Sequence, residues 1–159
     1  MKKIYQYFLL TFFMLSLASC EKDDEDMPGQ LSAKVDNVAW QADGSILAVI
    51  DNRNGDNLLI IFAKDNKNEE IIITAKDVTG TGTYTDATDP SRNHGQYTIN
   101  PNKYWYSLFL NSFSVTITKF DQTAKKISGT FRFQAEAAHD NSIKSITDGV
   151  FTNVSFDTY

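Results

Sequence analysis

The clearest pattern in the chain is a strict alternation of apolar and polar residues near its C-terminal end. From Ile127 to Ala137, apolar or small residues occupy every second position, and polar residues such as Arg132 stand between them. Because successive side chains of a strand point to opposite faces, this pattern predicts a strand with one face in a core. Residues 113–118 alternate in the same way, and segment 121–124 predicts the turn of a β-hairpin. The residues assigned to the core of the longer strand are Ile127, Gly129, Phe131, Phe133, Ala135 and Ala137.

The start of the folded region predicts a second hairpin. Apolar residues alternate from Leu31 to Val35, and Trp40 follows shortly after. Asp36 and Asn37 lie between these two stretches, and both residue types tolerate the positive φ of a tight turn. We therefore expect two antiparallel strands joined at this pair.

Three central segments, 46–50, 58–63 and 71–73, are apolar at consecutive positions. They are short and β-branched, and turn-rich stretches separate them, so we expect central strands covered on both faces. In a two-layered sheet only one face of each strand is core. We expect the aromatic stretch 97–109 to cover the other face, and a partner subunit is the alternative. The residues assigned to that outer face are Leu47, Val49, Leu59, Ile61 and Ile72.

The whole pattern predicts an all-β fold. Short strands are also expected near 82–85 and 96–99, linked by a loop through 89–90. Roughly nine or ten short strands separated by turns favour an antiparallel β-sandwich. A lipocalin-like β-barrel is the alternative, but an up-and-down barrel would keep its outward positions polar.

Composition supports one folded domain. The chain is 42% hydrophobic and 13% aromatic, which is enough to fill a core. Domains most often run about 100 to 150 residues, so we assign residues 31–159 to a single β-sandwich domain. Cys20 is the only cysteine. No internal disulfide can form, and the fold must therefore rest on its core.

The N-terminal segment resembles a bacterial lipoprotein signal peptide. Two lysines precede an apolar run that is too short to span a bilayer, and the run ends in Leu17-Ala18-Ser19-Cys20. The resemblance implies that residues 1–19 are removed and that Cys20 carries lipid, including palmitate, on its sulfur and nitrogen. Two or more acyl chains hold a protein stably on a membrane, since each buried methylene contributes roughly 0.8 kcal/mol. An ordinary secretory signal with a chance cysteine is the alternative.

Residues 20–30 form an acidic tether behind the cysteine. Such a run repels itself and stays extended, so it can hold the domain up to about 35 Å from the lipid. Lys22, Asp23 and Asp24 resemble the surface-export signal of Bacteroidota lipoproteins. That resemblance implies an outer-membrane protein that faces the cell exterior, whereas a purely solvated tether is the simpler interpretation.

The net charge of the mature chain limits the classes of partner that it can bind. Removal of residues 1–19 takes away Lys2 and Lys3, so the net charge changes from −5 to −7. An acidic protein does not seek nucleic acid or anionic lipid surfaces. We expect membrane contact through the lipid anchor alone, and a monomeric domain.

Four segments together resemble a family of small Bacteroidota lipoproteins of unknown function. They are Ala33-Lys34-Val35-Asp36-Asn37-Val38-Ala39-Trp40, residues 115–121, residues 126–131 and the closing Asp148-Gly149-Val150-Phe151. The resemblance covers most of the mature chain, but its motifs are those of strands and turns. It therefore implies fold and location, and it brings no catalytic residues.

A search for catalytic chemistry finds little. His94 lies in a polar loop and His139 beside an aspartate, and neither has the His or Cys neighbours of a zinc site. No nucleophile elbow, phosphate-binding glycine loop or metalloprotease helix motif occurs. Glu69 and Glu70 are adjacent, but neighbouring residues of a strand point to opposite faces, so they do not form an acid–base pair. We expect no metal and no cofactor.

Two further groups of residues are weaker candidates for a binding site. Residues 51–57 are rich in oxygen ligands, but Arg53 occupies the third position of the calcium loop that they would form, so an Asn-Gly turn is the simpler interpretation. Tyr104, Trp105 and Tyr106 could stack on sugars or peptides. In a strand, Trp105 must face away from its two neighbours, which puts one set in the core.

These observations favour a non-catalytic binding or envelope-interaction module with a glycan or protein ligand. The alternative is a hydrolase whose residues assemble only in the fold. A pocket that gathers His94 or His139 with carboxylates would favour the hydrolase, whereas a shallow aromatic strip would favour the binding module.

Overall fold

The computed structural model describes residues 28–159 except 88, 90, 109 and 139. The predicted signal peptide, Cys20, the export residues Lys22, Asp23 and Asp24, and His139 lie outside the described residues. Within the described ranges no helix is long and apolar enough to cross a membrane. The strands are β1 (Gln30–Val35), β2 (Val38–Gln41), β3 (Ser45–Asp51), β4 (Leu58–Lys64), β5 (Glu70–Ala75), β6 (Gly82–Thr85), β7 (His94–Asn100), β8 (Lys103–Tyr106), β9 (Ser114–Asp121), β10 (Lys126–Glu136) and β11 (Ile143–Thr158).

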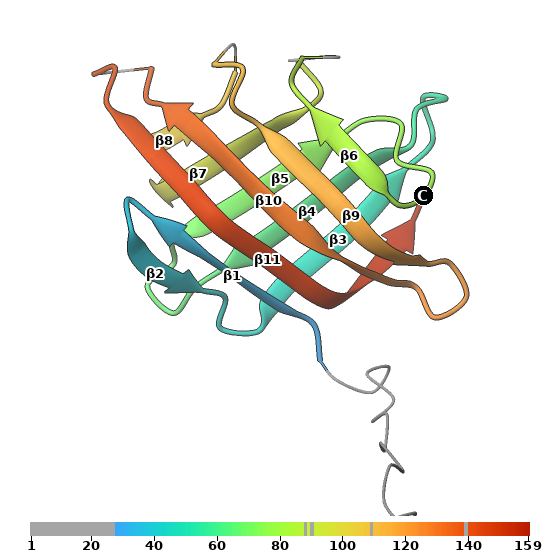
Figure 1. Cartoon of the computed structure of the whole chain (residues 1–159). Coiled ribbons are helices and arrows are strands. Elements are labelled where there is room, and N and C mark those ends of the chain that lie inside the picture. The colour runs from blue at the N-terminus through green and yellow to red at the C-terminus, as the bar shows by residue number, and fades with distance from the viewer. Residues whose placement is uncertain (1–27, 88, 90, 109, 139) are drawn as a thin grey trace, which may run out of the picture.

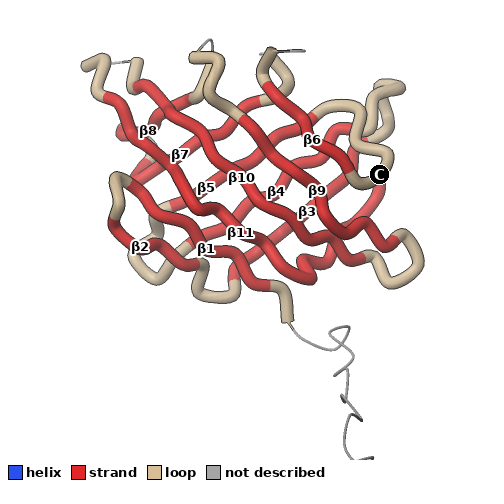
Figure 2. The backbone as a smooth tube through the Cα atoms, viewed as in Figure 1, coloured by secondary structure: helices blue, strands red, loops and turns tan. Residues whose placement is uncertain are grey.

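The strands form two layers that face each other across the core. Figure 1 shows a front layer in the order β2-β1-β11-β10-β9-β6, and a back layer in the order β3-β4-β5-β7-β8. The strands of one layer run across those of the other (Figure 2). The predicted all-β sandwich is therefore confirmed, with eleven described strands in place of the expected nine or ten.

The two layers belong to one continuous sheet. Phe156 to Thr158, at the end of β11, pair in parallel with Ala48 to Ile50 of β3. At the opposite side a single residue pair, Glu136 with Tyr106, links β10 to β8. The other described pairings are antiparallel. Because β11 pairs with β1 and β10 in the front layer and with β3 in the back layer, it connects the two layers.

Both predicted hairpins are present. β9 and β10 pair across the turn at Asp121 to Lys126, and the inward positions of β10 are buried as the alternation predicted. β1 and β2 pair around Asp36 and Asn37, whose φ angles are 50° and 67°. The Asp36 carboxylate also accepts a hydrogen bond of 2.9 Å from the Ser145 backbone N–H, which ties this turn to β11.

The prediction that the central strands are covered on both faces is wrong. In β3, β4 and β5 one face is buried, but the other face lies on the outside of the back layer. Leu47, Val49 and Ile72 face outward as expected, whereas Leu59 and Ile61 are fully buried. A run of consecutive apolar residues does not show which alternate set faces the core, and the pairing of β4 with β3 decides it.

The stretch 97–109 does not cover that outer face. Its strands β7 and β8 continue the back layer beside β5, with β7 paired to β5 and β8 paired to β7. Tyr97 and Trp105 point into the core, where they are 3% and 2% exposed. The apolar area of this stretch therefore fills the interior and leaves the outer face open.

Three phenylalanine rings lie against three buried glycines. A Cβ atom on Gly95 of β7 would lie 2.4 Å from the ring of Phe133, which comes from the opposite layer. A Cβ on Gly129 would overlap the Thr116 carbonyl oxygen and lie 2.6 Å from the ring of Phe151, and one on Gly149 would lie 2.7 Å from the ring of Phe131. Real Cβ atoms do not approach so closely. The rings therefore occupy the space that side chains would need at these three positions.

Truncation of Phe133 to alanine should strongly destabilise the domain. Its ring is 2% exposed and contacts Phe113, Phe131 and Gly95. Loss of a buried phenylalanine typically costs about 3 to 5 kcal/mol of unfolding free energy. Arg132→Ala, on the exposed side of the same strand, is the control. Equal denaturant midpoints for the two variants would show that the register of β10 is misassigned.

Gly149→Ala tests the glycine contacts. The added methyl would meet both the Phe131 ring and the Phe131 carbonyl oxygen, 2.6 Å away. Overpacking of this kind costs about 1 to 3 kcal/mol. Gly80→Ala is matched to it, because no atom lies within 4 Å of the position of its Cβ. We expect a lower urea midpoint for Gly149→Ala alone, and an unchanged midpoint would refute the contact.

Candidate functional site

The outer surface of the back layer carries apolar and tyrosine side chains from five neighbouring strands. Strand pairing places twelve side chains of β3, β4, β5, β7 and β8 on one continuous face. We call this surface the back face. It consists of Leu47, Val49, Leu58, Ile60, Phe62, Ile72, Thr74, His94, Gln96, Thr98, Tyr104 and Tyr106.

One half of the back face is apolar. We call it the aliphatic half, because Phe62 is its only aromatic residue. Leu47 pairs with Phe62, and Phe62 pairs with Ile72, so their side chains lie side by side across three strands. Leu47 is 53% exposed and the other two are half-buried. Val49 and Ile60 form the next row of the same half. These side chains lie on the face of the back layer opposite the core.

Two ion pairs border the aliphatic half. Lys64 Nζ lies 3.3 Å from Glu70 Oε1 at one end. At the other end, Arg53 donates two hydrogen bonds to the Asp51 carboxylate, of 2.9 and 2.7 Å. These bonds lower the pKa of Asp51 to about 2, so this carboxylate stays ionised at neutral pH. An apolar centre is thus bounded by charged groups.

The other half of the back face carries two tyrosines. The rings of Tyr104 and Tyr106 lie 5.4 Å apart in an edge arrangement. Gln96 pairs with Tyr106, and its side-chain amide donates a hydrogen bond of 2.8 Å to the Thr98 hydroxyl. The resulting surface is a shallow aromatic strip with amide and hydroxyl groups beside it.

The structure places Trp105 on the opposite side of β8 from the two tyrosines. Its ring lies 5.7 Å from that of Tyr97 in the core, and its indole N–H donates a hydrogen bond of 2.9 Å to Ser142 Oγ. Trp105 thus links the back layer to the loop before β11. Of the three residues proposed as a platform, only Tyr104 and Tyr106 are available to a ligand.

His94 lies at the edge of the same strip. Its ring centroid is 6.4 Å from that of Tyr106. Its Nδ1 atom is buried and makes no hydrogen bond to any described residue. Burial disfavours the charged imidazolium and lowers the pKa of His94, so the ring adds no positive charge to the strip at neutral pH.

The acidic groups singled out from the sequence have structural partners. Asp56 pairs with Arg92 at 2.9 Å and with Lys76 at 3.7 Å. Glu69 accepts a hydrogen bond of 2.6 Å from the Tyr97 hydroxyl, and burial together with this bond raises the pKa of Tyr97. No cluster of three or more His, Cys, Asp or Glu residues that could hold a metal occurs among the described residues.

The loop 51–57 is a turn. Gly55 has a φ of 81°, and its backbone N–H bonds to the Asn52 carbonyl oxygen at 3.1 Å. The Asp51 carboxylate is held by Arg53, as described above. This geometry supports the Asn-Gly turn that the sequence favoured over a calcium loop.

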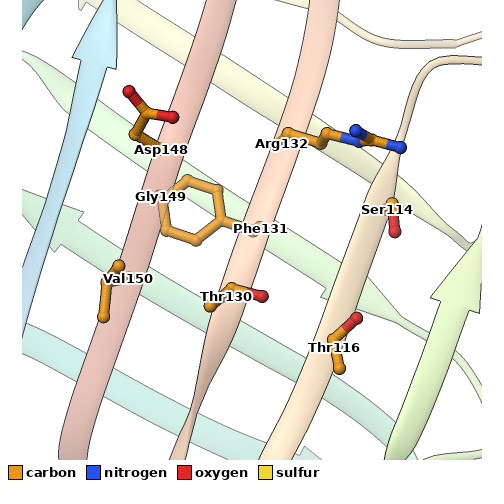
Figure 3. A pocket seen from close by; sticks show the side chains of 8 residues that line it. All are labelled: Ser114, Thr116, Thr130, Phe131, Arg132, Asp148, Gly149 and Val150. Atoms are coloured by element: carbon orange, nitrogen blue, oxygen red, sulfur yellow. The ribbon is translucent and has the colours of Figure 1, made fainter.

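The outer surface of the front layer has a shallow hollow of about 530 Å³ (Figure 3). It lies where β11 bulges at Asp148, whose φ is 51°, and at Gly149, which has no side chain. In Figure 3 the Arg132 side chain extends toward Ser114, and the Asp148 carboxylate points the other way. Asp148 binds Lys34 at 2.8 Å. The polar groups here diverge, so this hollow is a weaker candidate than the back face.

Comparisons with known proteins identify a family. The family model described as a domain of unknown function, DUF6252, matches residues 28–155. The comparisons with curated proteins and with solved structures found no match. The family match spans all the strands that form the back face.

The burial of His94 predicts a lowered midpoint for the titration of its ring. Because burial lowers its pKa, its ring proton resonances should shift at a pH below the value of 6.5 expected for a free histidine. An NMR titration would measure this, and His94→Gln would assign the signal. A midpoint at or above 6.5 would show that the ring is solvated or faces a carboxylate that the structure does not place there.

Proposed function

We propose that this chain, which belongs to the DUF6252 family of domains of unknown function, is a lipid-anchored surface protein that binds a protein partner through its back face. The family match identifies the domain but assigns it no activity. The supporting observation is the uncovered aliphatic and tyrosine-bearing face opposite the core.

The back face has the composition of a protein interface. Specific interfaces have an apolar centre depleted in charge, a polar rim and anchoring aromatic residues. Here Leu47, Phe62 and Ile72 form the centre, the ion pairs of Lys64 and Asp51 lie at its border, and the tyrosines flank it. Large contiguous apolar patches on soluble monomers mark interaction sites.

A protein fits the aliphatic half better than a glycan does. Sugars are recognised by hydrogen bonds to their hydroxyl groups together with flat aromatic contacts. The side chains of Val49, Ile60 and Ile72 offer neither. On the back face a glycan fits only the strip at Tyr104 and Gln96, which makes it the second candidate ligand for this face.

The anchor is proposed from the sequence. The lipobox ending at Cys20 and the Lys22-Asp23-Asp24 run support a mature protein held on the outer membrane and exported to its outer surface. On such a protein an exposed apolar face meets envelope or host proteins. The acidic tether leaves the domain free to orient toward them.

Cys20→Ala should release the protein from the membrane fraction, because no second anchor is proposed. Fractionation and immunoblotting of cells that express the full chain would measure this, with Ser19→Ala as the control. Retention of the Cys20 variant in the membrane would refute the anchor. Protease added to intact cells should digest the wild type, and full protection would refute surface display.

Site-directed photo-cross-linking tests the back face. A photo-reactive residue at Phe62 or Tyr106 should give one discrete adduct on intact cells, because a docked partner lies over both positions. The same residue at Thr130, on the exposed front layer, is the control. Adducts of the Thr130 variant alone, or none from either back-face position, would refute the proposal. An adduct between two copies of the chain would replace the distinct partner with a homodimer.

A further inference from the structure

A second hollow lies at one end of the sandwich, away from the back face. It has a volume of about 350 Å³ and lies where the C-terminal end of β11 meets β3. Figure 1 shows the C-terminus at this end of the sandwich. The turns after β3, after β5 and after β9 surround it. Six of the residues that line it form its apolar floor and amide rim: Ile50, Phe120, Phe156, Asn52, Asn57 and Gln122.

The floor of this end pocket is aromatic. Phe120 and Phe156 stack with ring centroids 5.3 Å apart and an interplanar angle of 14°. Phe156 is 3% exposed, whereas Phe120 is half-buried, so Phe120 presents its ring to the pocket. Stacking fixes the orientation of the Phe120 ring, which gives a ligand a rigid apolar surface at little entropic cost.

Three residues with side-chain amides line the hollow beside this floor. The side chains of Asn52, Asn57 and Gln122 come from two different turns and line the same hollow. Within the described part of the chain, none of the three amide groups makes a hydrogen bond. Each amide carries both donors and an acceptor, so the rim can pair with groups that donate and accept at once. Hydroxyl groups have this property.

A single cationic group lines the pocket. Lys125 Nζ lies 5.4 Å from the Phe156 ring centroid and 3.4 Å from the Thr158 hydroxyl. The described structure shows no carboxylate paired with this ammonium group. A carboxylate of a bound ligand could pair with Lys125.

We propose that the end pocket binds one acidic sugar ring, such as a uronic acid. The Phe120 ring would contact the apolar C–H face of the sugar, the three amides would bind its hydroxyls, and Lys125 would bind its carboxylate. A volume of about 350 Å³ lies at the lower end of the ~300 to 1,000 Å³ typical of ligand sites, which suits one ring. The pocket shares no residue with the back face, so this inference does not depend on the proposed partner.

NMR titration of the lipid-free domain, residues 21–159, with glucuronate tests the pocket. The side-chain amide signals of Asn52, Asn57 and Gln122 should shift in a saturable way, while that of Gln96 on the back face should not. Glucose, which lacks the carboxylate, should bind more weakly, and benzoate, which lacks the hydroxyls, should not shift the amides. No shifts with either sugar would overturn the proposal. Equal affinity for glucose, or tighter binding of benzoate, would overturn the assigned ligand class.

Variants separate the roles of the lining residues. Gln122→Ala and Lys125→Met should each raise the dissociation constant of glucuronate about three- to tenfold, as expected for the loss of one hydrogen bond or ion contact. Lys125→Met should leave the weaker binding of glucose unchanged, which a purely structural role would not produce. Gln96→Ala is the matched control. Unchanged glucuronate affinity in both pocket variants would contradict the assignment.

Discussion

The contact of phenylalanine rings with glycine backbone is the constraint on which the rest of this fold depends. Phe133 of the front layer lies against Gly95 of the back layer, and this contact sets how closely the two layers approach. Within the front layer, Gly129 pairs with Phe151 and Phe131 pairs with Gly149, so each strand supplies one ring and one glycine to the other. The large rings fit only because the glycines leave room for them.

Because of this packing, the core does not use the outer apolar side chains of the back layer. The rings of β10 and β11, with Tyr97 and Trp105 from the back layer, fill the interior without help from the outer side chains of β3, β4 and β5. Those outer positions nevertheless carry Leu47, Phe62 and Ile72. Since the core does not need them, a binding role is the simplest reason for their presence, and the back face is proposed on this ground.

The sequence predicted the fold class and both hairpins, because period-two alternation and turn residues are local properties. It also indicated that one face of the consecutive apolar strands lies outside the core, but the expectation that the stretch 97–109 covers this face was wrong. It could not assign that face. Leu59 and Ile60 are both apolar, and the register that β4 adopts with its neighbours decides which of them faces the core. The end pocket was not predicted at all, since Asn57, Phe120 and Phe156 are brought together by strand pairing across the whole chain.

Among the candidate site residues, Tyr104 and Tyr106 share a surface, as expected from their spacing along one strand. The same alternation places the side chain of Trp105, between the two tyrosines, in the core. His94 was assigned to a polar loop, but β7 begins with it, so its partial burial could not be read from its neighbours in the sequence.

The most direct measurement is the NMR environment of the Gly95 Hα protons. If the Phe133 ring lies flat against Gly95, these protons should resonate well upfield of their random-coil position and show strong NOE cross-peaks to the ring protons of Phe133. A random-coil chemical shift without such cross-peaks would contradict the layer contact and the architecture built on it.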